Sequence, residues 1–577
     1  MSRSYPPGIL SAHVHPRDTA PLTRRGFLMA GAAAAAGVAL SARRAGASPV
    51  VIPLNARTRR TSPNAWIPDA VPAEELRALA SVAMEAARGA GADFADIRIG
   101  VQRGVDVIHV PNGSASIALS VGYGVRAWIN GTWSFQHGNV FTRDAVAEAA
   151  RSAVVGARTY AAVNARLPRG PRYIPATDWV PAPVVTGTWE VPVEIDPFGV
   201  SLDDYHRVLE TLSATPVERD LFHHVSIEAF SLGWNDDTRV FASTAGTLVT
   251  QYRIDGGPQY FGAGVGAVQG PGVSVDLPEL PQRPGGFELA FVAARVDRSM
   301  TGVDDALFLT ELPPRAFTDI GRFPIVFEGS AMAELVGRTV DAALDGDRVA
   351  GIEADASGLS FLAPADEILN ADQPQFSPLL SMTADRAMPS SVAVQWDDDG
   401  VVSERYSLVE HGRVVGYHTT RETAPILAAW NQRHGIPPRS HGCSVAPTPA
   451  SVPMGGGAHV HVASAAASAS VRDLIRDMKH GFVIRGGRWR VDQGLTAGTF
   501  DRPWLCLEVK NGVPVARTSV SLQFATKTLF QKNFVAIGDA TTVRTATVLA
   551  MKGIPWEGVA QQISAPAALC KEVDVIL

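Results

Sequence analysis

Short runs with the alternation of β-strands dominate the chain beyond residue 171, and this feature restricts the fold most. Glycine and proline, 53 and 40 residues of the chain, separate many of these runs. The pattern predicts an antiparallel sheet with appended helices between residues 171 and 298, and a mostly β region after residue 320. The expected strands of the middle part are Val225–Leu232, Val240–Ser243, Thr247–Ile254 and Phe287–Arg295, and the expected helices are Ser201–Ser213, Met332–Leu344 and Ser470–Met478.

The part before residue 171 combines helices with strands. Apolar residues at helical spacing predict helices over Ala73–Ala90 and Arg143–Tyr160, the second capped by Thr142. The segments between these helices alternate as strands do: Asp96–Val101, Val105–Val110 and Ser116–Trp133, the last interrupted by Gly122, Gly124 and Gly131. The fold class expected for the whole chain is therefore α+β. The predicted divisions are a signal peptide (1–47), a linker (48–72), an N-terminal α/β domain (73–170), a middle β-rich domain (171–319) and a large β-rich C-terminal domain (320–577).

The first 47 residues have the features of an export signal. Arg24 and Arg25, followed by Gly-Phe-Leu, precede a short alanine-rich apolar run and the small residues that end at Ala47. This order predicts a twin-arginine signal that is cleaved after Ala47, and a periplasmic or other extracytoplasmic location. A retained N-terminal anchor is the alternative, because Arg43 and Arg44 could stop transfer.

Charge and cysteine content exclude several classes of protein. The formal net charge is −6 without a long run of either sign, which argues against binding to nucleic acid. The three cysteines, Cys443, Cys506 and Cys570, allow at most one disulfide, so the chain is no disulfide scaffold. No further apolar run reaches the length of a membrane span, and we expect no membrane association after cleavage of the signal.

Several segments occur along the chain in an order that resembles the TldD/PmbA family, whose members pair as the heterodimeric peptidase TldD–TldE. They are GADFADIRI, GVRAWINGTWSFQ, VEIDPFGVSLDD, RVFASTAGTLVTQ, GGFE, SSVAVQWDDDGVVSER and GIPWEGVAQQISAP. The resemblance extends over nearly all of residues 74–575. It implies an N-terminal α/β region, a middle domain and a β-rich C-terminal domain that carries the peptidase site in the active member. It also implies an extended polypeptide substrate and, as partner, a TldD-type metallopeptidase subunit or a second copy of the chain.

The metal motif of the catalytic members, HExxxH, is degenerate in this sequence. After the strand Pro324–Gly329, Glu334 stands at the glutamate of the motif, but Ala333 and Arg338 stand at its two histidines. The third ligand of the family, a cysteine, should lie within Thr541–Gly553, and this stretch contains none. Alanine has no lone pair to donate, and the guanidinium of arginine stays protonated and repels a dication. We therefore expect no zinc at the family position and no other cofactor.

Glu334 can be interpreted in two ways, and a metal site could also lie elsewhere in the sequence. Glu334 is either a vestigial general base or one partner of a helical ion pair with Arg338. A relocated metal site is the alternative at His459 and His461, which alternate onto one face of a strand. The acidic run Asp397–Asp399 is expected to be a solvated or capped turn.

Three functions follow from these observations. The first is a non-catalytic, TldE-like subunit that binds extended polypeptide beside a zinc-bearing relative. The second is an active metallopeptidase with a relocated metal site. The third is a self-associating or scavenging protein without a role in proteolysis.

Overall fold

The computed structural model describes residues 10–13, 71–109, 114–166, 179–213, 217–218, 223–267, 273–276, 283–291, 312–387, 390–501, 503 and 505–576. Arg24, Arg25 and the cleavage site after Ala47 lie outside these residues. Within the described ranges, no helix combines the length and the apolar character needed to cross a bilayer.

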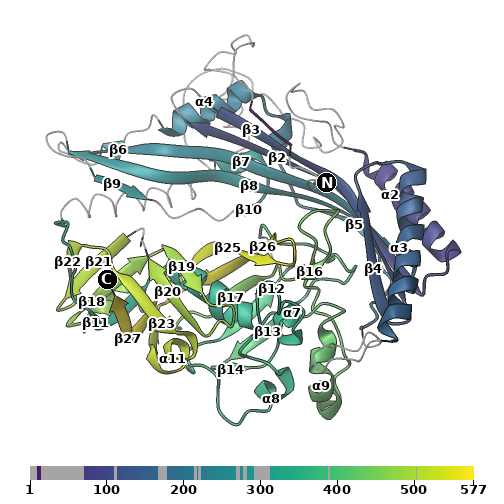
Figure 1. Cartoon of the computed structure of the whole chain (residues 1–577). Coiled ribbons are helices and arrows are strands. Elements are labelled where there is room, and N and C mark those ends of the chain that lie inside the picture. Colours follow the sequence, from purple (N-terminus) through teal and green to yellow (C-terminus); the bar gives the residue numbers. More distant parts are fainter. Residues whose placement is uncertain are drawn as a thin grey trace, which may run out of the picture.

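A large sheet forms the upper layer of the molecule in Figure 1. Its strands follow the order β1-β3-β2-β7-β8-β10, and four shorter strands pair with this path. The central strands come from both the 73–170 and the 171–319 segments, which therefore share one sheet. The bounds are β1 Leu10–His13, β2 Phe94–His109, β3 Ser114–Ile129, β4 Thr132–Gly138, β5 Thr186–Glu190, β6 Val217–Glu218, β7 His223–Ser243, β8 Leu248–Ala267, β9 Val273–Asp276 and β10 Arg283–Pro284.

Two helices cover part of this sheet. α2 (Ala73–Gly89) and α3 (Arg143–Asn164) bury their apolar faces against β2 and β3, and the side chain of Thr142 caps α3 as expected. α4 (Leu202–Ser213) packs near β7, close to the predicted bounds. The expected strand Phe287–Arg295 is wrong, since Phe287–Phe291 forms a 3₁₀-helix. The apolar run of this segment is short enough to form either a strand or a helical turn. In the structure, the ring of Phe287 packs on those of Trp234 and Tyr205.

The C-terminal domain contains two further sheets around one core. The first has the order β19-β20-β23-β27-β11-β18-β21-β22, with β24 beside β27; the second is β14-β13-β12-β17-β26-β25. The first comprises β11 Gly321–Phe327, β18 His480–Arg485, β19 Arg488–Val491, β20 Ala497–Asp501, β21 Leu505–Lys510, β22 Val513–Arg517, β23 Ser521–Ala525, β24 Phe534–Ile537 and β27 Ala568–Ile576. The second comprises β12 Met382–Asp385, β13 Arg405–Glu410, β14 Arg413–Val414, β17 His459–Val462, β25 Arg544–Lys552 and β26 Glu557–Ala565.

Short elements complete this domain. They are α6 Gly329–Val336, α7 Gly346–Ala350, α8 Ala365–Leu369, α9 Ala428–His434, α10 Val471–Ile475, α11 Thr526–Thr528, and the two-stranded pair β15 Ser444–Val445 and β16 Met454–Gly455. The predicted helices at 332–344 and 470–478 thus exist, but with different bounds. The α+β fold class is confirmed, and all three cysteines are free and buried.

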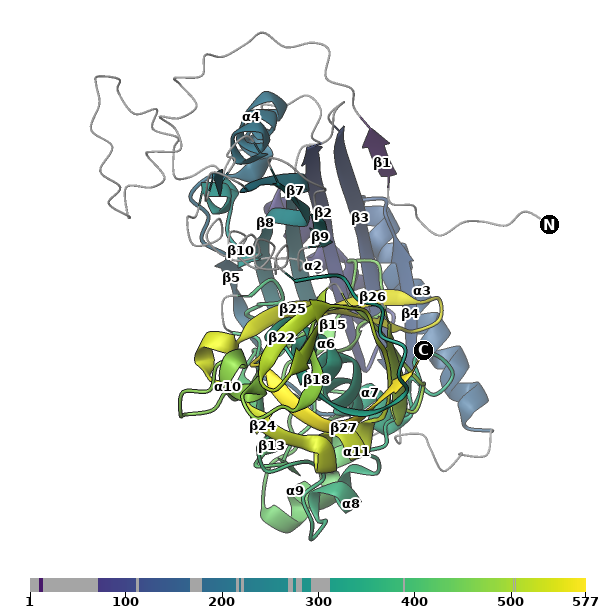
Figure 2. The ribbon, with the colours of Figure 1, turned by 90° about the vertical axis from the view of Figure 1, so that its left-hand side faces the viewer.

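The large sheet lies over the second C-terminal sheet (Figures 1 and 2). Glycines on β2 and β3 make room for the loop between β15 and β16. A Cβ atom at Gly122 would lie 2.9 Å from the Ala450 Cβ, and one at Gly100 would lie 3.3 Å from the Pro449 Cγ. Gly122, which the sequence suggested as a strand interruption, is therefore a contact point between the two parts of the molecule, as is Gly100.

Candidate functional site

The degenerate motif lies on α6, which follows β11 directly. Ala333 is completely buried, whereas Glu334 and Arg338 are half-buried. α6 ends at Val336, and a π-helical turn, Gly337–Asp341, continues it. In a regular α-helix, residues five positions apart point in directions about 140° apart at 3.6 residues per turn. A π-turn connects residue i to i+5 and so reduces this angle, and such turns are frequent at functional sites. Here the π-turn begins at Gly337, so Ala333 lies in the α-helical part and Arg338 in the π-helical part.

α6 lies unusually close to β25 and β26. Small residues recur at every fourth position of its inner face: Gly329, Ala333 and Gly337. A Cβ atom at Gly329 would lie 2.4 Å from the Thr542 carbonyl oxygen, and one at Gly337 would lie 2.9 Å from both Ile563 Cγ1 and Val548 Cγ2. The helix therefore packs against the strands with no space for a larger side chain on this face.

The stretch in which the third ligand was expected, Thr541–Gly553, does lie against α6, because most of it is β25. Val548 is buried and points at Gly337. The structure thus places β25 against the helix that carries the degenerate motif, and none of Ala333, Arg338 and Val548 has a side chain that ligates zinc. Arg338 has a buried Nε without a hydrogen-bond partner among the described residues. Its ion pair with Glu334 stays a prediction, and the π-turn alters the i,i+4 spacing on which that prediction was based.

A buried cation lies at the far end of β25. The Nζ of Lys552 is 2.6 Å from Asp345 Oδ2, 2.8 Å from Asp347 Oδ2 and 2.7 Å from the Gly455 carbonyl oxygen. Burial alone would lower the pKa of Lys552, but the two carboxylates outweigh burial and raise it. Asp347 lies on α7, which follows the π-turn, so the contacts of Lys552 anchor β25 to the end of the helical region.

A second buried network extends from the π-turn. The Nε2 of His418 is 2.8 Å from Asp341 Oδ1, and its Nδ1 is 2.5 Å from the Tyr406 hydroxyl, which in turn contacts Cys443 Sγ at 2.9 Å. Burial opposes protonation of His418, but Asp341 outweighs it and raises the pKa of His418 to about 10. His418 is therefore an imidazolium at neutral pH, held by a buried carboxylate.

His459 and His461 lie on the opposite face of the six-stranded sheet from α6. Ile563 points toward Gly337 and is directly opposite Val460 in the parallel pairing of β17 and β26. Val460 therefore faces α6, and its two neighbours face the other way. The two imidazole rings lie 4.0 Å apart, and His459 Nε2 is 2.8 Å from Ser564 Oγ. His459 Nδ1 and His461 Nε2 are buried without partners among the described residues.

The electrostatics of this pair favour neutral rings. Burial, and then the neighbouring His461, lower the pKa of His459 to about 3, and burial also lowers the pKa of His461. Neutral imidazoles can ligate metals. No group of three His, Cys, Asp or Glu side chains within the described ranges is arranged to hold a metal, so this pair would lack a third such ligand. A relocated zinc site like that of known hydrolases, with three protein ligands, does not fit these residues.

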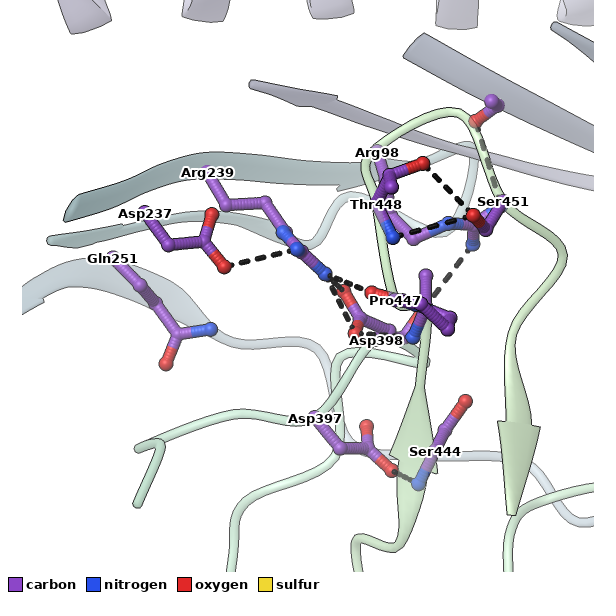
Figure 3. A network of polar contacts seen from close by, with 12 residues as sticks. Arg98, Asp237, Arg239, Gln251, Asp397, Asp398, Ser444, Pro447, Thr448 and Ser451 are labelled. Atoms are coloured by element: carbon purple, nitrogen blue, oxygen red, sulfur yellow. Dashed lines mark hydrogen bonds and ion pairs between the residues drawn. The ribbon is translucent and has the colours of Figure 1, made fainter. Parts of the chain in front are cut away.

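The acidic run Asp397–Asp399 is buried between the two layers, so it is not solvated, but it does form a capped turn. The Oδ1 of Asp397 accepts from the backbone N–H groups of Asp399 and Val401. Figure 3 shows Arg239 of β7 between Asp237 and Asp398, with Nη1 2.9 Å from both carboxylate oxygens of Asp398. Arg126 of β3 is 2.6 Å from Asp399. Arginines within predicted strands were a signal in the sequence for buried ion pairs. Their acidic partners could not be identified from the sequence, because they lie about 160 to 270 residues away.

β25 forms an edge of its sheet. It pairs with β26, and no other described strand pairs with it. Four large apolar side chains on β25 and its hairpin are between 41% and 73% exposed: Leu549, Met551, Ile554 and Trp556. An unpaired strand edge with exposed apolar side chains can accept another strand.

Comparison with known proteins places this fold. Residues 320–576 match the family model described as the PmbA/TldA metallopeptidase C-terminal domain. The C-terminal domain of this chain therefore belongs to the TldD/PmbA family. No curated protein matches it significantly.

Solved structures share the whole architecture. The crystal structure of TldE from Thermococcus kodakarensis superposes with a TM-score of 0.58 at 15% identity and covers 87% of this chain and 100% of its own. Two proteins described as putative modulators of DNA gyrase are also similar. That from Bacteroides thetaiotaomicron has a TM-score of 0.56 at 15% identity, covering 87% of this chain and 99% of its own. The protein from Thermotoga maritima has a TM-score of 0.57 at 12% identity, and the match covers 87% of this chain and 100% of its own. At these identities the likeness shows the fold alone.

Proposed function

We propose that this chain is a non-catalytic subunit that binds extended polypeptide and associates with a zinc-bearing relative in the processing of peptides or proteins. The observation that carries the proposal is the closed contact between α6 and the sheet. Ala333 has no exposed surface, Gly337 touches two strands, and Arg338 brings a fixed positive charge to the position of the second ligand. A hydrolytic zinc needs three ligands and an open coordination position for water, and this arrangement supplies neither.

Binding of polypeptide is proposed at the edge of β25. Backbone N–H and C=O groups there can pair with an added strand, and Leu549 and Met551 project from the same face to contact alternate side chains of that strand. The resemblance to TldE supports association with a catalytic partner, and self-association is the alternative.

Peptide cleavage by the purified chain, alone and together with a relative that carries an intact HExxxH, tests this function. We expect cleavage only in the presence of the relative, and well under one zinc per chain in the protein alone. Cleavage by the chain alone would contradict the proposal. Stoichiometric zinc that is lost on His459→Gln or His461→Gln would favour the relocated metal site instead, which the unpartnered nitrogens of these residues make the second candidate.

We also propose export by the twin-arginine pathway. Replacement of Arg24 and Arg25 by lysine keeps the charge but removes the pair that the export receptor recognises. The variant should accumulate as cytoplasmic precursor. Undiminished export would contradict the signal assignment.

A further inference from the structure

A cavity of about 140 Å³ lies between the large sheet and the C-terminal domain. This volume is many times the ~10–15 Å³ that one water requires. Arg239, Arg253 and Arg386 line it together with Asp237, Asp397 and Asp398 (Figure 3 shows four of these residues). Trp189 and Trp396 add apolar surface. The cavity is therefore built from buried charges of both signs and a few rings.

The cations of this cavity are not all satisfied. Arg386 is 3% exposed and donates only to the carbonyl oxygens of Gly442 and Ser444, with no carboxylate partner among the described residues. Arg253 is 3.6 Å from Asp237 and 3.8 Å from Asp255, beyond ordinary hydrogen-bond length. The Nε atoms of Arg239, Arg253 and Arg386 are all buried without acceptors.

The carboxylate oxygens of Asp397 and Asp398 already accept other hydrogen bonds, so they do not pair with Arg253 or Arg386. Both oxygens of Asp398 accept from Arg239, and Asp397 accepts three backbone N–H groups, those of Asp399, Val401 and Ser444. Burial, and then Asp399, raise the pKa of Asp397 to about 7, so its negative charge is incomplete at neutral pH. The cavity consequently has guanidinium donors without acceptors, beside carboxylates that already accept other hydrogen bonds, which favours a carboxylate ligand.

The cavity also adjoins the proposed binding edge. Gly558 and Ala560 of β26 form part of its wall. These residues lie directly opposite Met551 and Leu549 of β25, so all four share one face of the sheet. A strand added along β25 would therefore pass next to the wall of the cavity.

We propose that this cavity binds the C-terminal carboxylate of the polypeptide that lies along β25. The inference rests on the proposed function and adds to it that a chain end, rather than an internal segment, is recognised. The carboxylate accepts from Arg253 and Arg386, and the last amide N–H of the polypeptide donates to the unpartnered Oδ1 of Asp237. An N-terminal ammonium group would instead meet three guanidinium groups.

The test measures binding of a fluorescein-labelled ten-residue peptide of alternating valine and lysine to the purified full-length chain by fluorescence anisotropy. The peptide is used with a free C-terminal carboxylate and as its amide. We expect the free acid to bind at least about tenfold more tightly. In Arg253→Gln the difference should fall below about threefold, because the amide loses nothing there. Arg253 is 26% exposed, which makes this variant the least disruptive of the three arginines. Arg322→Gln, on the exposed surface of β11, is the matched control and should retain the full difference.

Each other result is decisive. Equal binding of acid and amide, or an unchanged difference in Arg253→Gln, would overturn the assignment of the cavity while leaving strand addition intact. Failure of both peptides to bind would overturn the proposed function as well. N-acetylvaline and inorganic phosphate serve as competitors, and binding of either as tightly as the peptide would show that a free small anion is the ligand and overturn the chain-end proposal.

Discussion

The two faces of the six-stranded sheet have opposite chemistry. The face toward α6 is apolar and closely packed, with Val460, Val548 and Ile563 against the helix. The buried charge of Lys552 on this face is paired with two carboxylates. The face toward the large sheet carries His459 and His461 with unpartnered nitrogens and adjoins the cavity with unused guanidinium donors. The face that holds the family's metal motif is thus closed by packing, whereas the opposite face borders a cavity whose guanidinium groups have unused donors.

The largest expected effect concerns the paired charge. Lys552→Met removes the cation between Asp345 and Asp347 and leaves two buried carboxylates side by side, so the free energy of unfolding should fall by about 3–5 kcal/mol. Arg322→Met, at a surface pair with Asp574, is the control and should change it by less than about 1 kcal/mol. Urea unfolding measures both. Equal effects of the two substitutions would contradict the difference between buried and surface charge.

The buried histidine His459 should make the stability of the protein sensitive to acid. A folded-state pKa of about 3 for His459 lies below the unfolded value near 6.5, so the native state binds fewer protons and loses stability as the pH falls below about 6.5. Between pH 7 and pH 5 this loss amounts to about 2 kcal/mol.

The variant His459→Gln isolates that contribution. Between pH 7 and pH 5, the free energy of unfolding of this variant should fall by about 2 kcal/mol less than that of the wild type. His434→Gln, at an exposed ring on α9, should behave as wild type. Parallel pH dependences of wild type and His459→Gln would show that His459 titrates normally in the folded protein.

The sequence predicted the elements whose local signals are complete. The helices at 73 and 143 carry an apolar face and, in the second, a capping threonine, and both form within a few residues of the expected bounds. The long strands were predicted in pieces, because glycines such as Gly104 look like breaks. In the structure a Cβ atom at Gly104 would lie 3.3 Å from that of Ala118, so this glycine reflects close packing across strands. Such a reason depends on the partner strand and has no local signature.

The candidate site likewise has features that could be predicted from the sequence and features that could not. The loss of the zinc ligands at Ala333 and Arg338 could be inferred from motif spacing alone. The π-turn, the contact of Val548 with Gly337 and the burial of Asp397–Asp399 could not, because each depends on segments about 50 to 300 residues apart or on a departure from regular helix geometry. The cavity has contributions from both layers and no sequence motif at all.

The third prediction tests the closed packing of α6. Ala333→His should lower the free energy of unfolding by about 1–3 kcal/mol, because the position is completely buried against β25 and β26. Zinc should not restore this loss in the double variant Ala333→His/Arg338→His, since a third ligand is lacking. Val548 lies within the stretch where the third ligand was expected and its side chain points at Gly337, so Val548→Cys is the substitution to add. Tight zinc binding by the double variant without the cysteine, measured by metal content and by stability with added zinc, would contradict the three-ligand requirement.

The smallest expected effect concerns Glu334, the residue of the motif that this sequence retains. A general base must reach a metal-bound water, and the positions that would hold the metal carry Ala333 and Arg338. Glu334 is half-buried on α6, so Glu334→Gln keeps its size and should change the free energy of unfolding by at most about 1 kcal/mol. Peptide cleavage by the complex with a zinc-bearing relative should be unchanged, since the reacting groups lie in that relative. The equivalent glutamate-to-glutamine substitution in the relative is the matched control and should abolish cleavage. If Glu334→Gln abolished it instead, the α6 face would be the catalytic one, and the contrast between the two faces of the sheet would have to be reversed.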